Sequence, residues 1–308
     1  MQTDKQPVVL IGGGTGLVGS RLSQILRDSG YTVWHLSRRS NPDAEFPAFA
    51  WDPAAGTIDE NAVAGADYII NLAGAGIADQ RWTQARKRLI IESRTHSTRL
   101  LINTLQRLKR QPRAYISSAA IGIYGNTGDQ IVTETDPPGS GFLAVSCVAW
   151  EAAIDEVMAA GIRTVGLRIG VVLSTKGGAL EKLLLPLNFG TAAYFGDGSM
   201  WYSWIHIDDV CRMFQFAMEN EPLQGYYNAV APEPVTNREF TKQIVEASGK
   251  RALTLPAPAV GLRLAMGEMA DVILNSNRIS SEKIATAGFL FRFPKLDEAL
   301  RDILEKSI

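Results

Sequence analysis

Three glycines at intervals of three residues follow a short apolar stretch near the start of the chain. The apolar residues 8–11 predict a buried strand, and residues 20–27 have the apolar spacing of a helix. Because glycine has no Cβ, its backbone can approach a diphosphate closely where N–H groups point out of a helix start. A glycine turn can also be purely structural, but the strand before it and the helix after it favour a dinucleotide site. The residues of this turn that we expect to contact the dinucleotide are Gly13, Thr15, Gly16, Leu17, Val18 and Gly19.

A hydroxyl and a guanidinium follow the second expected strand, 31–36. In a dinucleotide-binding fold the end of this strand meets the adenosine ribose, where an acidic residue would bind the 2′-hydroxyl of NAD. The chain has Ser37 and Arg38 there instead, followed by Arg39. These groups suit a 2′-phosphate, so we expect NADP rather than NAD. The alternative is that the two arginines are solvated loop charges.

Small residues end the next strand, 67–74. Leu72, Ala73 and Gly74 would let a cofactor lie against the backbone, although a tight turn would also explain them. A basic stripe follows over residues 81–99. Such a stripe is usually a solvated helix face, but it comes directly after the small residues, so we consider Arg81 and Arg94 as candidate phosphate ligands. The long apolar strand 164–173 should also reach the cofactor, at Val171.

Two side chains near the strand 114–120 are candidate catalytic residues. Ser118 lies close to the end of this strand, and Tyr124 follows it. A serine there can hydrogen-bond a substrate hydroxyl or carbonyl, and the tyrosine can approach the nicotinamide. The alternatives are that the serine caps the next turn and that the tyrosine only fills the wall of the cleft.

Motifs along most of the chain resemble those of one superfamily. They are the glycine turn, Asn71-Leu72-Ala73-Gly74, Ser117-Ser118 with Tyr124-Gly125, Leu167-Arg168-Ile169, residues 204–210 and Tyr227-Asn228-Ala229. In this order they resemble the extended short-chain dehydrogenase/reductases, which include sugar-nucleotide epimerases and dehydratases. A poorly characterised branch, known as nucleoside-diphosphate-sugar epimerase or SulA-like proteins, has a small C-terminal domain of its own. The segments that resemble this branch are Arg81-Trp82, Glu92-Ser93-Arg94, 142–151 and 267–294. The resemblance implies contacts with NADP from Ser37, Arg38, Leu72, Ala73 and Arg94.

The acid–base pair of the superfamily is missing. The resemblance implies a tyrosine and, four residues later on the same helix, a lysine, but the aligned residues are Leu143 and Cys147. Leucine has no proton to transfer, and a thiol is not a fixed positive charge. Cys147 and Glu151 are candidate substitutes, although a packed thiol and a surface carboxylate are the simpler interpretations. We interpret His206 as structural.

Composition limits the classes of partner. The chain has 31 Lys and Arg against 32 Asp and Glu, so no bulk charge attracts nucleic acid or a membrane surface. The polar first residues lack the apolar core of a signal peptide, and no apolar run is long enough to span a bilayer. Cys147 and Cys211 make no disulfide framework, and their spacing suits no zinc site. We therefore expect a cytoplasmic protein with a small-molecule substrate and with no metal, membrane or nucleic-acid partner.

The predicted fold is α/β, a Rossmann-type doubly wound parallel sheet with a smaller, mostly helical C-terminal lobe. We expect residues 1–172, completed by 201–232, to form the NADP-binding domain. Residues 173–200 and 233–308 should form the smaller lobe.

Three functions remain open on the sequence alone. We favour an NADP-dependent oxidoreductase or epimerase with a non-standard acid–base, acting on an unknown small substrate such as a carbonyl compound or a sugar nucleotide. The alternative is a non-catalytic NADP-binding sensor, which the missing pair would explain. A nucleic-acid binder using the stripe 81–99 conflicts with the nearly neutral net charge.

Overall fold

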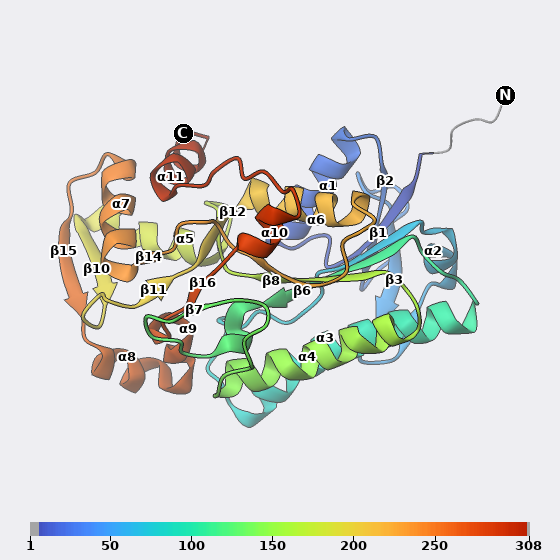
Figure 1. Ribbon diagram of the computed structural model, residues 1–308, viewed down its shortest axis with the longest axis horizontal. Helices are drawn as coiled ribbons and strands as arrows, with labels where there is room; N and C mark the ends of the chain where they lie inside the picture. The colour runs from blue at the N-terminus through green and yellow to red at the C-terminus, as the bar shows by residue number, and fades with distance from the viewer. Residues whose placement is uncertain (1–5, 307–308) are drawn as a thin grey trace.

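An eight-stranded sheet forms the centre of the larger lobe (Figure 1). The computed structural model describes residues 6–306. Along the sheet the order is β13-β8-β6-β5-β1-β2-β3-β4, and all neighbours are parallel except β3 and β4. The strands are β1 (Val8–Gly12), β2 (Thr32–Ser37), β3 (Ala48–Asp52), β4 (Thr57–Ile58), β5 (Tyr68–Asn71), β6 (Ala114–Ala120), β8 (Thr164–Ile169) and β13 (Gly225–Ala229). The predicted fold class is confirmed.

The strand order reverses between β1 and β5. From β1 the chain continues through β2 and β3 on one side, and later through β5, β6, β8 and β13 on the other. Such a switch point is where open parallel sheets bind ligands, outside the carboxyl ends of the strands. The register brings Gly12 level with Asn71, so the glycine turn and the loop after β5 leave the sheet side by side.

Helices cover both faces of the sheet, which explains why β1 and β5 are buried along their whole length. On one face α1 (Leu17–Asp28) packs against α6 (Ile207–Glu219), and on the other α3 (Gln84–Arg107) packs against α4 (Phe142–Ala159) and α2 (Glu60–Gly65) (Figure 1). The helix predicted from the basic stripe begins at Gln84 because the Thr83 side chain caps it, accepting from the Arg86 N–H.

The smaller lobe combines helices with short two-stranded sheets. Its sheets pair β10 (Thr191–Phe195) with β15 (Leu253–Ala257) and β11 (Trp201–Tyr202) with β14 (Val235–Thr236). Its helices are α5 (Gly178–Leu184), η2 (Leu185–Phe189), α7 (Asn237–Ser248), α8 (Ala259–Met266), η3 (Gly267–Ala270), α9 (Asp271–Leu274) and α11 (Leu296–Glu305). A separate apolar core around Trp204, Phe240 and Leu300 holds them together. Thr236 caps α7, because its side chain accepts from the Glu239 N–H.

The long strand predicted over 164–173 is wrong: it breaks at Gly170. A Cβ at this glycine would lie 2.5 Å from the Ser203 carbonyl oxygen, so the backbone at Ser203 passes directly against it. The second piece, β9 (Val171–Leu173), leaves the central sheet and pairs with β12 (Trp204–His206). Helix α5 ends at Leu184, where a 3-10 turn with Pro186 takes over. The proposed division into two domains stays a prediction.

His206 joins α6 to the C-terminal helix. Its Nδ1 accepts from the Asp208 N–H at 3.0 Å and so caps α6, and its ring stacks on Phe293 at 3.9 Å between centroids. Its Nε2 lies 3.2 Å from an oxygen of Asp302 in α11. These contacts give the buried histidine a structural role. The remaining elements within residues 6–306 are short: β7 (Ile131–Val132) pairs with β16 (Arg278–Ile279), η1 (Ile121–Tyr124) follows β6, and α10 (Glu282–Thr286) packs near β13.

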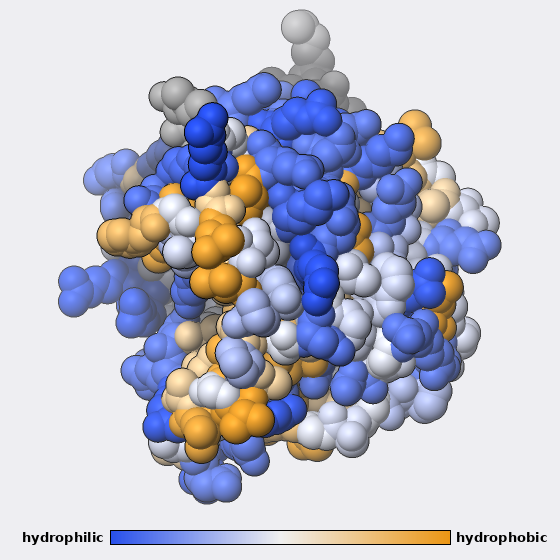
Figure 2. Space-filling model, turned by 90° about the vertical axis from the view of Figure 1, so that its left-hand side faces the viewer, coloured by the Kyte–Doolittle hydropathy of each residue, from blue (hydrophilic) through white to orange (hydrophobic). Residues whose placement is uncertain are grey.

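Apolar side chains are exposed on the outer face of the smaller lobe (Figure 2). They come from η2, β15 and α8, and include Phe189, Leu253, Val260 and Leu264. Within residues 6–306 no helix combines the length and the apolar character that crossing a bilayer requires.

Candidate functional site

The three glycines of the first turn have different neighbours. A Cβ at Gly13, where φ is +81°, would lie 2.8 Å from the backbone of Leu72, and one at Gly19 would lie 2.3 Å from the Gly13 oxygen. These two glycines are therefore required because the protein packs against itself. Gly16 is exposed, a Cβ there would come only within 3.3 Å of the Gly13 oxygen, and it caps α1 without a side-chain hydrogen bond. Gly16 is thus the glycine beside which a phosphate can reach the N–H groups of the helix start.

Replacing Gly16 with alanine should weaken dinucleotide binding about three- to tenfold while leaving the melting temperature nearly unchanged. The backbone of Gly16 is extended, with φ −75°, so alanine can adopt it. Its Cβ would lie 3.3 Å from the Gly13 oxygen and would hinder the approach of a ligand. Titration calorimetry and thermal melts would measure both effects. Gly261→Ala, in an exposed stretch of α8 where a Cβ meets open space, is the matched control. A Gly16→Ala protein with unchanged affinity would contradict the assignment.

A cavity of about 580 Å³ opens beside the start of α1. Thr15, Gly16 and Leu17 line one side of it, and residues 174–176, which follow β9, line another. Val18 packs instead against the core beneath the sheet. The structure therefore places three of the predicted turn residues at an open space, which the loop 174–176 also lines.

His35 supports the glycine turn from below, a role that sequence reasoning missed. Its Nε2 lies 2.7 Å from the Ser23 hydroxyl, and a Cβ at Gly14 would lie 2.4 Å from the imidazole ring. The ring is buried, and burial lowers the pKa of His35. It therefore stays neutral at pH 7 and holds α1 against β2.

The buried His35 should make stability depend on pH. Because its pKa is lower in the folded protein than in the unfolded chain, the unfolded chain takes up the proton first, and stability falls as the pH drops below about 6.5. His35→Gln should flatten the melting profile between pH 7 and 5. His96, exposed on α3, provides the control variant His96→Gln, whose profile should match that of the unmodified protein. Equal slopes for both variants would show that His35 does not titrate in this range.

Arg38 stands exposed just beyond the end of β2, next to the half-buried Ser37. In the described part of the chain no carboxylate forms an ion pair with it. A free guanidinium at this position is available to an anionic ligand. The contact with a 2′-phosphate stays a prediction.

The loop after β5 is held in place by Asn71. Its side-chain amide lies within hydrogen-bond distance of the hydroxyls of Ser97, Thr98 and Tyr115, and its Oδ1 accepts from the Ala73 N–H at 3.2 Å. The Leu72 N–H bonds the Gly12 oxygen at 2.8 Å. The predicted cofactor residues of this loop therefore lie directly against the glycine turn.

Arg94, not Arg81, lies at this loop. A Cβ at Gly74 would be 3.0 Å from the Arg94 Cζ, and the guanidinium donates to the oxygens of Ala75 and Ile90 at 3.0 and 2.9 Å. Arg81 is exposed and lies near Gly267 of η3 in the smaller lobe. Of the two candidates the structure thus brings only Arg94 to the carboxyl edge of the sheet.

The two candidate catalytic hydroxyls each donate within the protein. Ser118 is buried, and its hydroxyl donates to the main-chain carbonyl oxygen of Asn71 at 3.1 Å. Tyr124, also buried, donates to the Asn228 Oδ1 at 2.7 Å and accepts from Arg168 at 2.8 Å. Burial raises the pKa of Tyr124 to about 12. Their catalytic role stays a prediction, and each has a structural bond in the absence of substrate.

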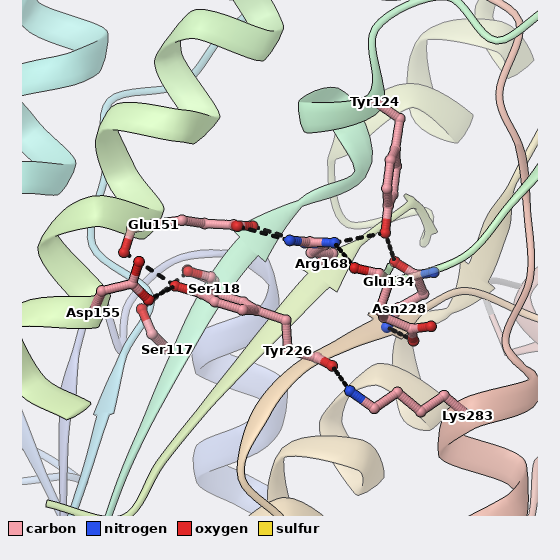
Figure 3. A network of polar contacts seen from close by, with 10 residues as sticks. All are labelled: Ser117, Ser118, Tyr124, Glu134, Glu151, Asp155, Arg168, Tyr226, Asn228 and Lys283. Carbon is pink, nitrogen blue, oxygen red and sulfur yellow. Dashed lines mark hydrogen bonds and ion pairs between the residues drawn. The ribbon is translucent and has the colours of Figure 1, made fainter. Parts of the chain in front are cut away.

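Figure 3 shows the polar network around Arg168. The guanidinium on β8 forms two bonds of 2.8 Å with the carboxylate of Glu151 on α4, and both side chains are 8% exposed. The interpretation of Glu151 as a surface carboxylate is therefore wrong: helix α4 packs flat against the sheet and buries it. In the same network the Tyr226 hydroxyl donates to Asp155 at 2.8 Å. Lys283 donates to the main-chain carbonyl oxygen of Tyr226 at 2.7 Å.

Leu143 and Cys147 lie one turn apart on α4 and face η1. A Cβ at Gly122 would lie 3.4 Å from the Leu143 Cβ and 3.5 Å from the Cys147 Sγ. The thiol is buried, and burial raises the pKa of Cys147 to about 12. Cys147 and Cys211 are both free thiols, and Cys147 is neutral at pH 7.

Val171 opens β9 and bonds the Ser203 oxygen through its N–H at 2.9 Å. It is half-buried beside the loop 174–176, and its predicted contact with the cofactor stays a prediction.

A comparison with known families agrees with this geometry. The model described as "NAD dependent epimerase/dehydratase family" matches residues 9–229, well over half of the chain. The chain belongs to this family. A second model, a domain of unknown function named DUF1731, matches residues 257–303 of the smaller lobe. The resemblance inferred from the motifs is thus confirmed.

Individual members of the epimerase family are similar over nearly the full length. Epimerase family protein Mb2239 of Mycobacterium bovis is 38% identical over 95% of this chain and 96% of its own. The solved structure of human epimerase family protein SDR39U1 (isoform 2) with NADPH is 30% identical, covers 97% of this chain and 99% of its own, and has a TM-score of 0.86. A nucleoside-diphosphate sugar epimerase from Corynebacterium glutamicum is 31% identical with a TM-score of 0.79, covering 97% of this chain and 58% of its own.

Proposed function

We propose that this epimerase-family protein binds NADP(H) across the carboxyl edge of its central sheet. The observation that carries the proposal is Arg38, an exposed guanidinium without an ion-pair partner in residues 6–306, at the strand end where the adenosine ribose of a dinucleotide lies. The turn around Gly16 fits the diphosphate, because nothing but the Gly13 oxygen would touch a Cβ there. The human relative solved with NADPH supports the choice of cofactor.

We further propose an oxidoreductase or epimerase that acts on a small substrate, such as a carbonyl compound or a sugar nucleotide. When bound, NADPH supplies a hydride. Protons must then come from the protein, and the candidate atoms are the Ser118 Oγ and the Tyr124 Oη. With its pKa near 12, Tyr124 is a phenol at pH 7 that can give a proton but cannot take one. Either group must exchange its bond to Asn71 or Asn228 for one to the substrate.

A cofactor-binding sensor without turnover is the second candidate. Leu143 and Cys147 cannot perform the acid–base work of a tyrosine and a lysine, and both candidate hydroxyls already donate within the protein. The basic stripe of α3 supports no nucleic-acid role, because Arg99 pairs with Glu156 and Lys87 with Glu268. We keep the sequence-based expectation of a small-molecule partner.

Absorbance of the reduced nicotinamide distinguishes the two candidates. Protein mixed with NADPH and a panel of carbonyl compounds, or with NADP⁺ and a panel of sugar nucleotides, should change this absorbance with at least one compound if the protein is an oxidoreductase. An epimerase that regenerates its cofactor would show product formation by chromatography instead. Tight NADPH binding with neither signal would support the sensor. Absence of binding to either nucleotide would contradict both.

A further inference from the structure

Arg94 is a largely buried cation without a carboxylate partner in the part of the chain that the structure describes. Its hydrogen bonds go to the carbonyl oxygens of Ala75 and Ile90, and its Cζ lies 4.9 Å from the ring centroid of Trp150. A guanidinium remains protonated in proteins, so this charge persists although burial lowers the pKa of Arg94. Neutral carbonyls and an aromatic face compensate only part of the lost hydration. An anion or another electron-rich group from outside the chain would complete the site.

The position of Arg94 fits the nicotinamide half of the dinucleotide site proposed above. Arg38 marks the adenosine end over β2, on one side of the switch point between β1 and β5. The nicotinamide end then falls on the other side, over β5 and β6. Arg94 lies there, against Gly74 in the loop that follows β5.

The charge of Arg94 also acts on Cys147, which occupies the position where the superfamily pattern has a lysine. Burial raises the pKa of Cys147 to about 12, Glu151 raises it as well, and the charges of Arg94 and Arg168 oppose this. The thiol therefore lies within the electrostatic reach of two guanidiniums. A lysine at residue 147, on α4, would add a third cation to the two that act on this position.

We propose that Arg94 supplies, from α3, the positive charge at the nicotinamide end that the superfamily pattern places on α4, and that this charge makes the site prefer NADPH over NADP⁺. The inference rests on the proposed binding of NADP(H). The oxidised nicotinamide ring carries a positive charge and the reduced ring is neutral, so a nearby guanidinium repels only the oxidised form. If Arg94 contacted a phosphate of the cofactor instead, it would strengthen the binding of NADP⁺ and of NADPH equally, because the two nucleotides have the same phosphates.

Titration calorimetry with NADPH and with NADP⁺ tests the charge directly. Arg94→Met should lower the ratio of Kd for NADP⁺ to Kd for NADPH about tenfold, and Arg94→Lys should keep most of the ratio. Arg99→Met, on the same helix but in an exposed pair with Glu156, is the control and should leave the ratio unchanged. Equal weakening of both nucleotides by Arg94→Met would overturn the inference while leaving the proposed function intact. If the unmodified protein binds neither nucleotide, the proposed function is wrong and the inference fails with it.

A second cycle of variants keeps the inference testable if Arg94→Met proves unstable. Cys147→Lys should lower the melting temperature more than Cys147→Met, which has a similar length without the charge. Adding Arg94→Met to Cys147→Lys should recover part of that loss, because it removes one of the cations that repel the new lysine. The double variant, in which the lysine at residue 147 replaces the charge of Arg94, should also keep the preference for NADPH that Arg94→Met alone loses. Additive changes in melting temperature would show that residues 94 and 147 do not share one charge site, and would overturn the inference.

Discussion

Replacing Arg168 with methionine should lower the free energy of unfolding by about 3–5 kcal/mol. The change removes both 2.8 Å bonds to Glu151 and leaves that carboxylate buried without a cation. It also removes the donor to Tyr124. Urea unfolding followed by circular dichroism measures the loss. The exposed pair of Arg99 and Glu156 is the control, because Arg99→Met should cost at most about 1 kcal/mol.

The loss of unfolding free energy in the Arg168→Met protein should depend on pH. Burial raises the pKa of Glu151, and in the variant no guanidinium opposes this. The folded protein then takes up a proton more readily than the unfolded chain, so the variant should become more stable relative to the unmodified protein as the pH falls from 7 to 5. A destabilisation that is the same at both pH values would show that the lost packing of Arg168, and not the isolated carboxylate, is responsible.

Replacing Arg38 with alanine should weaken NADPH binding about 10- to 100-fold and leave NADH binding unchanged. A hydrogen-bonded charge pair with a phosphate contributes about 1.5–3 kcal/mol to binding. NADH has no 2′-phosphate, so it makes no such contact with Arg38 and loses nothing. Because Arg38 is exposed and has no ion-pair partner in residues 6–306, its removal should not disturb the fold. Parallel fluorescence titrations with the two nucleotides give the ratio.

Arg110→Ala is the matched control for net charge. Arg110 is equally exposed but lies beyond the end of α3, away from the switch point. If Arg38→Ala and Arg110→Ala weaken NADPH binding to the same small extent, Arg38 contributes only general electrostatic attraction. If Arg38→Ala weakens NADH as well, the side chain shapes the adenosine site and does not read the 2′-phosphate.

The sequence alone predicted a doubly wound parallel sheet, and it singled out the residues proposed for the adenosine end of the candidate site. These features depend on short stretches of chain: a buried strand, glycines before a helix start, and the residues that directly follow a strand. Arg38 could be singled out because its position relative to β2 is fixed within a few residues. The absence of the acid–base pair could also be inferred from the sequence, since Leu143 and Cys147 are four residues apart on a single helix.

Only the tertiary structure decided which distant side chains meet. Arg81 and Arg94 belong to one basic stripe, yet the packing of α3 against α4 brings Arg94 to Gly74 and leaves Arg81 at the smaller lobe. The same packing buries Glu151 against Arg168, which the local sequence suggested was a surface residue. Propensity and apolar spacing act within one element, whereas a contact between elements depends on how whole helix faces fit the sheet. The glycine turn was therefore a property of local sequence, and the position of Arg94 beside the loop after β5 a property of the folded chain.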